Sequence, residues 1–287
     1  MGQKDITEKM LADYNDVFAD IVNVLLFHGE QVIGEYSLEN VKDKSQYKVD
    51  GKIHEEERDV SKVVNGQKVR IALIGFEHQT DVDKDEPIRV IGYDGASYRA
   101  QLLNDRKERY PVVTLVLYFG TTPWTGPKTL YEAVNVPDEW KPYVNDYKIN
   151  LFEIAFLNPE QVQLFTSSFK IVADYFVQMR MNKTYVATRE TFTHADELLK
   201  LMSVLTNDSR FEEAQQQAKL CGKGGMTNMC EVLDRVEAKG RAEGIRKSLQ
   251  ASKLLRKGIC TCVEELVSQG IEEDIAMEVY ADFMSEQ

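Results

Sequence analysis

Apolar residues along this chain recur first with helical spacing and later in nearly unbroken runs. Residues 7–27 carry them three or four positions apart, which predicts an amphipathic helix that ends at His28-Gly29. The run from 69 to 76 is β-branched and almost continuously apolar, a pattern typical of a strand buried on both faces. Asn65-Gly66 stands just before it and predicts a tight two-residue hairpin with the strand upstream.

Strand and helix patterns then alternate up to Asn158-Pro159, after which only helical patterns follow. The first part contains a helix from about 86 to 104, with Pro87 in its first turn, and strands at 110–119 and 149–156. The later helices are expected at 160–182, 191–206, 210–219 and, in pieces, 226–284. The pattern predicts an α/β fold: a mixed central sheet flanked by helices over residues 1–185, and an all-α region over 186–287.

The last helices are short and are joined at Gly258 and Gly270. A helix-turn-helix fits this pattern, and so does a small packing module through which two copies associate. No apolar run approaches 18 residues, and the N-terminus has no apolar signal region, so we expect a cytoplasmic protein without a membrane span. The four cysteines lack the paired spacing of a structural zinc site, and we expect reduced thiols.

Polar residues that could take part in catalysis or metal binding follow the apolar run directly. Glu77-His78-Gln79 begins where the run ends, and Glu77 and Gln79 share one strand face. Asp59 lies upstream, and an acidic turn at 81–85 leads into a helix that carries Arg89 and Tyr93 on one face. Farther on, an apolar strand ending in Tyr118-Phe119-Gly120 is followed by Pro123-Trp124. Trp124 and Trp140 are expected to anchor the core.

An Asp followed by Glu-x-Gln at a strand end resembles the PD-(D/E)XK nucleases. Together with the acidic turn, the Arg-x-x-x-Tyr helix and the proline-tryptophan turn, it resembles the Rpn-type recombination-promoting nuclease and putative transposase family. The resemblance covers roughly residues 5–185. It implies a restriction-endonuclease-like core and a Mg²⁺-dependent DNA endonuclease linked to recombination or mobile elements.

The resemblance also implies roles for individual residues. Asp59 and Glu77 would hold Mg²⁺, and Gln79 would orient the attacking water, because an amide cannot act as a base. Arg89 and Tyr93 would steady a phosphate or brace the metal site. Alternatively, these two side chains pack and ion-pair with the acidic turn. Asp16 and Asp20, on the first helix, are candidates for an outer ligand, although a solvated helix face is the simpler interpretation.

Strand register leaves the upstream ligand open. A strict two-residue turn pairs Val64 with Gln67 and sets Asp59 opposite Ala72, about 17 Å short of Glu77. The same register sets His54 opposite Glu77, with Glu56 next on that face. Glu56 is therefore the alternative ligand, and we favour Asp59.

A net charge of −12 argues against a protein that binds nucleic acids over its whole surface. The basic stretch from Arg235 to Lys257 is the local exception, and Arg241, Arg246, Lys247 and Lys253 are its candidate DNA contacts. A solvated helix face with ion pairs between successive turns is the alternative for this stretch. The alternative for the whole chain is an inactive nuclease fold that binds DNA or protein through its C-terminal helices.

Overall fold

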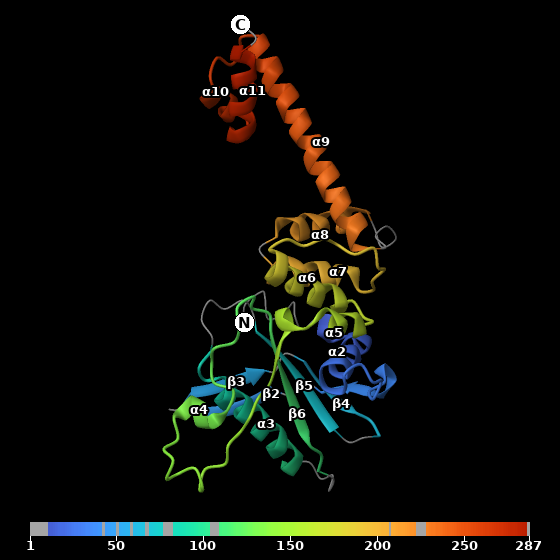
Figure 1. Cartoon of the computed structure of the whole chain (residues 1–287), viewed down its shortest axis with the longest axis vertical. Coiled ribbons are helices and arrows are strands. Elements are labelled where there is room, and N and C mark those ends of the chain that lie inside the picture. Colours follow the sequence, from blue (N-terminus) through green and yellow to red (C-terminus); the bar gives the residue numbers. More distant parts are fainter. Residues whose placement is uncertain are drawn as a thin grey trace. The chain divides into compact units, whose positions relative to one another are not determined.

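The computed structural model describes residues 11–41, 44–49, 52–57, 60–66, 69–76, 83–103, 109–206, 208–221 and 228–285. It divides into two compact units, Met1–Met229 and Cys230–Gln287, each considered by itself below (Figure 1). The first unit thus includes two helices beyond residue 185. The boundary at 185 stays a prediction about where an independently folding fragment ends.

The first unit is built on a mixed five-stranded sheet in the order β1-β4-β5-β6-β7. β1 pairs antiparallel with β4 and β4 with β5, whereas β5, β6 and β7 run parallel. The sheet strands are β1 Leu38–Asn40, β4 Val60–Val64, β5 Val69–Phe76, β6 Val112–Tyr118 and β7 Asn150–Glu153. A separate antiparallel pair consists of β2 Lys44–Val49 and β3 Lys52–Glu57. The predicted mixed central sheet is confirmed.

Both faces of the central strands are covered. Three successive residues of β5, Arg70–Ala72, are buried, as are five of β6, Thr114–Tyr118. Neighbouring side chains of a strand point to opposite faces, so burial of consecutive residues requires a layer on each side. On one face, Val90 and Tyr93 of α3 (Glu86–Leu103) pack with Val116 and Tyr118.

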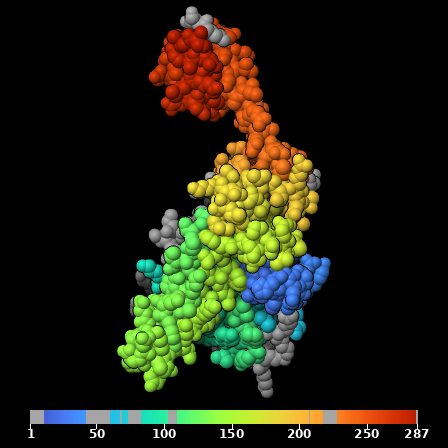
Figure 2. Space-filling view, viewed as in Figure 1, coloured from blue at the N-terminus to red at the C-terminus, as the bar shows by residue number. Residues whose placement is uncertain are grey.

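The opposite face is covered by α2 (Asn15–Phe27) and α6 (Phe169–Asn182). The Lys62 ammonium of β4 lies 5.5 Å from the Phe18 ring centre, and Phe119, just past β6, contacts the Phe176 ring at 5.3 Å. Figure 2 shows the blue surface of α2 beside the yellow-green surface of α5 and α6. Lys62 is fully buried, and burial lowers the pKa of its ammonium group.

The remaining helices follow the predicted order, apart from α4 (Leu130–Val134), which the sequence pattern did not predict. In the first unit these are α4 Leu130–Val134, α5 Pro159–Leu164, α7 Ala195–Leu205 and α8 Ser209–Cys221, with 3₁₀ turns at Glu35–Ser37 and Ile154–Phe156. The helix expected at 160–182 is interrupted between α5 and α6. His28 ends α2 in a left-handed conformation at φ 54°, as its position before Gly29 predicted.

The second unit consists of α9, α10 and α11, with bounds Met229–Arg256, Val263–Ser268 and Glu273–Ser285; α9 starts one residue before the unit does. Its core is one apolar cluster made of Ala251, Leu255, Cys260, Leu266, Ile271 and Ala276. Gly258 and Gly270 adopt positive φ where the sequence predicted the joints. Within the described residues, no helix is long and apolar enough to cross a membrane.

The β4–β5 hairpin exists, but its strict two-residue register is wrong. Val64 pairs with Val69 rather than Gln67, so the pairing is shifted by two residues. Asn65 continues the β1–β4 pairing beyond Val64: its backbone N–H donates to the Ser37 carbonyl at 2.7 Å, and its side-chain amide donates to Glu39 at 2.6 Å. The pairing of β4 with β5, in contrast, ends at Val64 and Val69.

The two tryptophans differ in environment. Trp124 is buried and meets Tyr118 edge-on at 5.2 Å, as expected of a core anchor. Trp140 is 59% exposed, so its prediction as a core anchor is wrong. Trp140 lies in a run of local turns, in which its backbone N–H donates to the Pro137 carbonyl at 2.9 Å. A turn closed on itself presents the indole to solvent.

Gly120 gives a direct test of how tightly the end of β6 is packed. A Cβ at this position would overlap the phenol ring of Tyr118, which is buried against Val90 and Trp124 and cannot swing away. We expect Gly120→Ala to lower the free energy of unfolding by about 1–3 kcal/mol in chemical denaturation. The matched control is Gly95→Ala in α3, where a Cβ meets nothing within 4 Å. That change should stabilise the chain by about 0.5–1 kcal/mol.

Candidate active site

The candidate active site lies at the carboxyl end of the parallel strands. Phe76, the last residue of β5, is level with Tyr118 of β6, which is level with Glu153 of β7. The N-terminal turns of α3 reach the same end, because Tyr93 packs in one cluster with Tyr118 and Trp124 (Figure 1). In open α/β sheets this edge is where ligands bind.

The predicted residues Asp59, Glu77 and Gln79 lie outside the described residues, and so does His78. The sequence nevertheless attaches them to described strands, since Glu77 follows Phe76 and Asp59 precedes Val60. Val60 is opposite Leu73, four residues before Glu77. The strict register would have set Val60 opposite Ile71, so β4 begins about 7 Å nearer the end of β5 than that register implied.

The observed strand register no longer supports Glu56 as the alternative metal ligand. It lies in β3, where its Cα partner is Ser45, and His54 is paired with Tyr47. Both belong to the separate two-stranded pair in the structure described. The register that set them opposite Glu77 is not the one observed, and Asp59 remains our predicted ligand.

Arg89 and Tyr93 lie at this end of the sheet, one helical turn apart. Arg89 Nη1 is 2.9 Å from Asp83 Oδ2 and 3.5 Å from Glu86 Oε2. Burial alone would lower the pKa of the Arg89 guanidinium, but hydrogen bonds with Tyr93 and Asp83 raise it above its usual range. Tyr93 is buried. These contacts match the packing and ion-pairing alternative, and a role toward phosphate stays a prediction.

The described carboxylates at this edge are already engaged. Glu153 Oε1 accepts a hydrogen bond from the Trp124 backbone N–H at 2.7 Å, and its other oxygen is 3.7 Å from Lys128 Nζ. Asp83 and Glu86 face Arg89. No group of three His, Cys, Asp or Glu side chains within the described ranges could hold a metal ion. The predicted ligands Asp59 and Glu77 lie outside those ranges, so their role as metal ligands stays a prediction.

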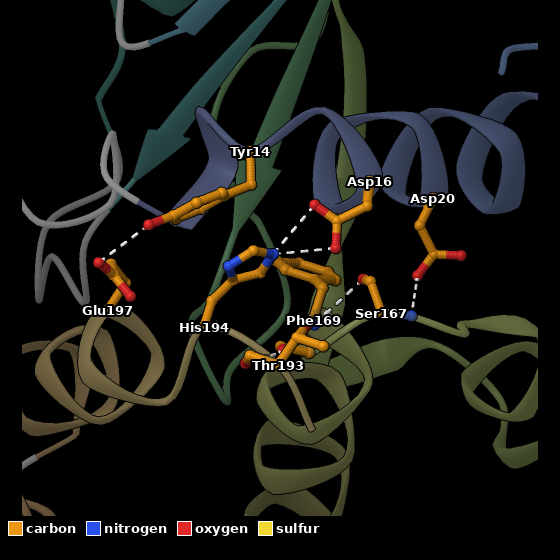
Figure 3. A network of polar contacts seen from close by, with 9 residues as sticks. Tyr14, Asp16, Asp20, Ser167, Phe169, Thr193, His194 and Glu197 are labelled. Atoms are coloured by element: carbon orange, nitrogen blue, oxygen red, sulfur yellow. Dashed lines mark hydrogen bonds and ion pairs between the residues drawn. The ribbon is translucent and has the colours of Figure 1, made fainter. Parts of the chain in front are cut away.

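Asp20 is buried, so its interpretation as part of a solvated helix face is wrong. Its carboxylate accepts hydrogen bonds from the backbone N–H groups of Thr166 and Ser167 and from the Thr166 hydroxyl, at 2.8–3.1 Å. Figure 3 shows Asp20 beside Ser167. These groups stand in the gap between α5 and α6. Asp20 thus fixes the break in the helix expected at 160–182, and its oxygens are not available to a metal.

Asp16 belongs to a second contact, with a residue that sequence reasoning left without a role. His194 Nε2 is 2.9 Å from Asp16 Oδ2, and its ring stacks on Tyr14 with centres 3.6 Å apart (Figure 3). The Tyr14 hydroxyl donates to Glu197 at 3.0 Å, and this hydrogen bond raises the pKa of Tyr14. The partners lie 178 residues apart in sequence, so no local spacing announces the contact.

The four basic candidates in the second unit lie on α9 but not on one face. Arg241, Arg246 and Lys253 are exposed, whereas Lys247 is partly buried and binds Glu272. Arg246 and Lys253 are seven residues apart, about two helical turns, and so share a face. Arg235 and Lys239 continue that face at spacings of four and seven, and Lys239 lies 3.9 Å from Glu243.

Comparison with known protein families identifies the family to which this chain belongs. The sequence profile of a family described as putative transposase, YhgA-like, matches residues 29–210, more than half of the chain. The chain belongs to this family. The match confirms the resemblance to the Rpn-type nuclease and putative transposase family, in which the YhgA-like family is grouped. No curated protein matches the chain, and no solved structure matches it.

The YhgA-like match differs in extent from the range expected at 5–185. It begins after α2 and continues through α7 to the first turn of α8. It therefore includes the strands β4, β5 and β6 and the N-terminal turns of α3, which form the candidate site. Arg241, Arg246, Lys247 and Lys253 lie beyond it.

Substitution of Asp20 and of Asp16 compares a buried, structural carboxylate with a partly exposed one. We expect Asp20→Asn to lower the free energy of unfolding by at least about 2 kcal/mol, because several donors lose a charged acceptor in a buried site. Asp16→Asn should cost no more than about 1 kcal/mol, since its ion pair with His194 is partly exposed. Urea denaturation of both variants measures the difference, and equal small effects would contradict the capping role of Asp20.

Proposed function

We propose that this chain is a divalent-metal-dependent DNA endonuclease whose site is formed by Asp59, Glu77 and Gln79. The observation that carries the proposal is the parallel register of β5 with β6. It brings the end of β5 level with Tyr118 and beside the first turns of α3, so the sequence attaches Glu77 to the edge where sheet proteins of this kind bind ligands. Membership of the YhgA-like family supports a transposase-like or nuclease-like role.

The donor chemistry suits magnesium. Mg²⁺ prefers oxygen ligands and keeps several waters, so two carboxylates suffice. Bound there, the cation would supply a water of lowered pKa and neutralise charge that develops on the phosphate. Asp59 and Glu77 would hold it. The Gln79 amide would position the water by hydrogen bonding, because it cannot take up the proton.

Arg89 supports this site through the first turn of α3. Its guanidinium binds Asp83 and Glu86, two acidic groups at the start of α3. Their negative charge would otherwise repel an approaching phosphate. Arg89 therefore acts as a positioning residue that keeps the approach to the metal electrically favourable.

Substitutions in the proposed metal site should separate ligands from helpers. We expect Glu77→Ala and Asp59→Ala to slow Mg²⁺-dependent nicking of supercoiled plasmid by about 10³-fold or more, because each removes half of the carboxylate clamp. Gln79→Ala should slow it by roughly 10- to 100-fold, since the metal keeps its ligands. Gln79→Lys should be tolerated, because Lys is the residue that many PD-(D/E)XK nucleases carry there.

Glu56→Ala is the matched control for the upstream ligand. It should leave nicking almost unchanged, and a loss equal to that of Asp59→Ala would transfer the ligand role to Glu56. Thermal melting of every variant should stay near that of the wild type. Unchanged cleavage by Glu77→Ala would contradict the proposed metal site and favour the alternative, an inactive nuclease fold that binds DNA or protein.

DNA affinity is assigned to the basic face of α9. Arg246 and Lys253 are exposed, and neither forms an ion pair within the described part of the chain. Together with Arg235 and Lys239 they extend over 18 residues, about 27 Å of helix. A row of cations of that length could contact several phosphates of a DNA backbone. Its contacts would contribute affinity without sequence preference.

The double variant Arg246→Gln/Lys253→Gln should weaken DNA binding and lower the slope of log affinity against log salt by about two, one for each lost phosphate contact. Fluorescence anisotropy at several salt concentrations measures both. Lys247→Gln is the matched control, because Glu272 already opposes that charge. If the double variant behaves like the control, the basic stretch is a solvated helix face.

A further inference from the structure

A cavity of about 960 Å³ opens between α6, the segment that follows it and the start of α8. Three basic side chains, Arg180, Lys183 and Arg210, line it together with one acid, Asp208. Its lining therefore carries a net charge of +2, three positive charges less one negative. That sign is opposite to the −12 of the whole chain.

Arg180 is held in place by contacts that leave its charge available, and Lys183 is exposed. Arg180 Nε donates to the Ala155 carbonyl at 2.6 Å, and its guanidinium lies 4.8 Å from the Phe156 ring centre. This fixes the side chain while its terminal nitrogens keep their donors. Lys183 is exposed and forms no ion pair within the described ranges. It ends α6 in a left-handed conformation at φ 58°.

Arg210 and Asp208 form the neutral part of the lining. Arg210 Nη2 is 2.7 Å from Asp208 Oδ2, and the Arg210 backbone N–H donates to the same carboxylate at 3.1 Å. Asp208 thereby caps the start of α8. The unopposed positive charge of the cavity is that of Arg180 and Lys183.

Two tyrosines and several residues with aliphatic hydroxyl groups also line the cavity. Tyr175 and Tyr185 lie with ring centres 5.0 Å apart, and both are buried. Thr121, Thr184 and Ser209 supply hydroxyls to the lining. Thr121 lies three residues after Tyr118, which is level with Phe76 at the end of β5. One lining residue of the cavity thus follows β6 at the end where the candidate active site lies.

We propose that this cavity binds the phosphate backbone of a single DNA strand. Cationic side chains and hydroxyl donors suit phosphate oxygens, and a positively charged groove that follows the backbone is typical of sites for single-stranded nucleic acid. A volume of about 960 Å³ suits a few nucleotides of one strand and is too small to enclose a double helix. The proposal deepens the proposed function, from which it takes only DNA as the ligand.

Lys183→Gln tests the proposal in the full-length chain. Binding of a labelled single-stranded oligonucleotide is measured by anisotropy in EDTA, so that no cleavage step enters. The variant should weaken binding and lower the slope of log affinity against log salt by about one. Its thermal melting should stay unchanged, because the Lys183 ammonium forms no ion pair among the described residues.

Two further variants close the test. Lys141→Gln is the control, since that exposed lysine is paired with Asp138 at 2.5 Å, and it should change nothing. Asp208→Asn raises the net charge of the cavity by one and should tighten binding, and its melting temperature reports the cost of the lost cap.

Equal binding by Lys183→Gln and wild type would overturn the proposal. So would a Lys183-dependent affinity for inorganic pyrophosphate without one for the oligonucleotide. Plasmid that stays supercoiled with Mg²⁺, together with Lys183-dependent oligonucleotide binding in EDTA, would overturn the nuclease proposal and support this one. Normal nicking with binding that does not depend on Lys183 would do the reverse, so the two failures are distinguishable.

Discussion

The parallel pairing of β5 with β6 is the constraint on which the rest of the first unit depends. Consecutive residues of both strands are buried, so a helical layer is needed on each face of the sheet. α3 covers one face and α2 covers the other. The same pairing sets Phe76 level with Tyr118. It therefore determines where the chain leaves β5, and with it the position of the candidate metal ligands along the sheet.

Several elements follow from local pattern alone. The apolar run at 69–76 became β5, and Pro87 after an acidic turn marked the first turn of α3. These elements are predictable because burial on two faces and the first turn of a helix leave direct traces in neighbouring residues. The glycine joints of the second unit are local in the same sense, since Gly258 and Gly270 take the positive φ that ends a helix.

Several features that sequence reasoning missed depend on distant partners. Asn65 bonds to Ser37 and Glu39 beside β4, and Asp20 breaks the helix expected at 160–182 by accepting hydrogen bonds from Thr166, which lies 146 residues later. His194 acquires its role only because α7 brings it to Asp16 and Tyr14. Asp59, Glu77 and Gln79 lie outside the described residues, so their roles remain predictions that rest on register and family.

The account places a divalent cation at the carboxyl end of β5 and makes DNA cleavage depend on it. Nicking of supercoiled plasmid by the purified wild-type chain, with Mg²⁺ and with EDTA in its place, tests that claim most directly. The account predicts conversion to nicked and linear forms with Mg²⁺ and none with EDTA. Plasmid that stays supercoiled with Mg²⁺, or that is nicked equally in EDTA, would contradict it.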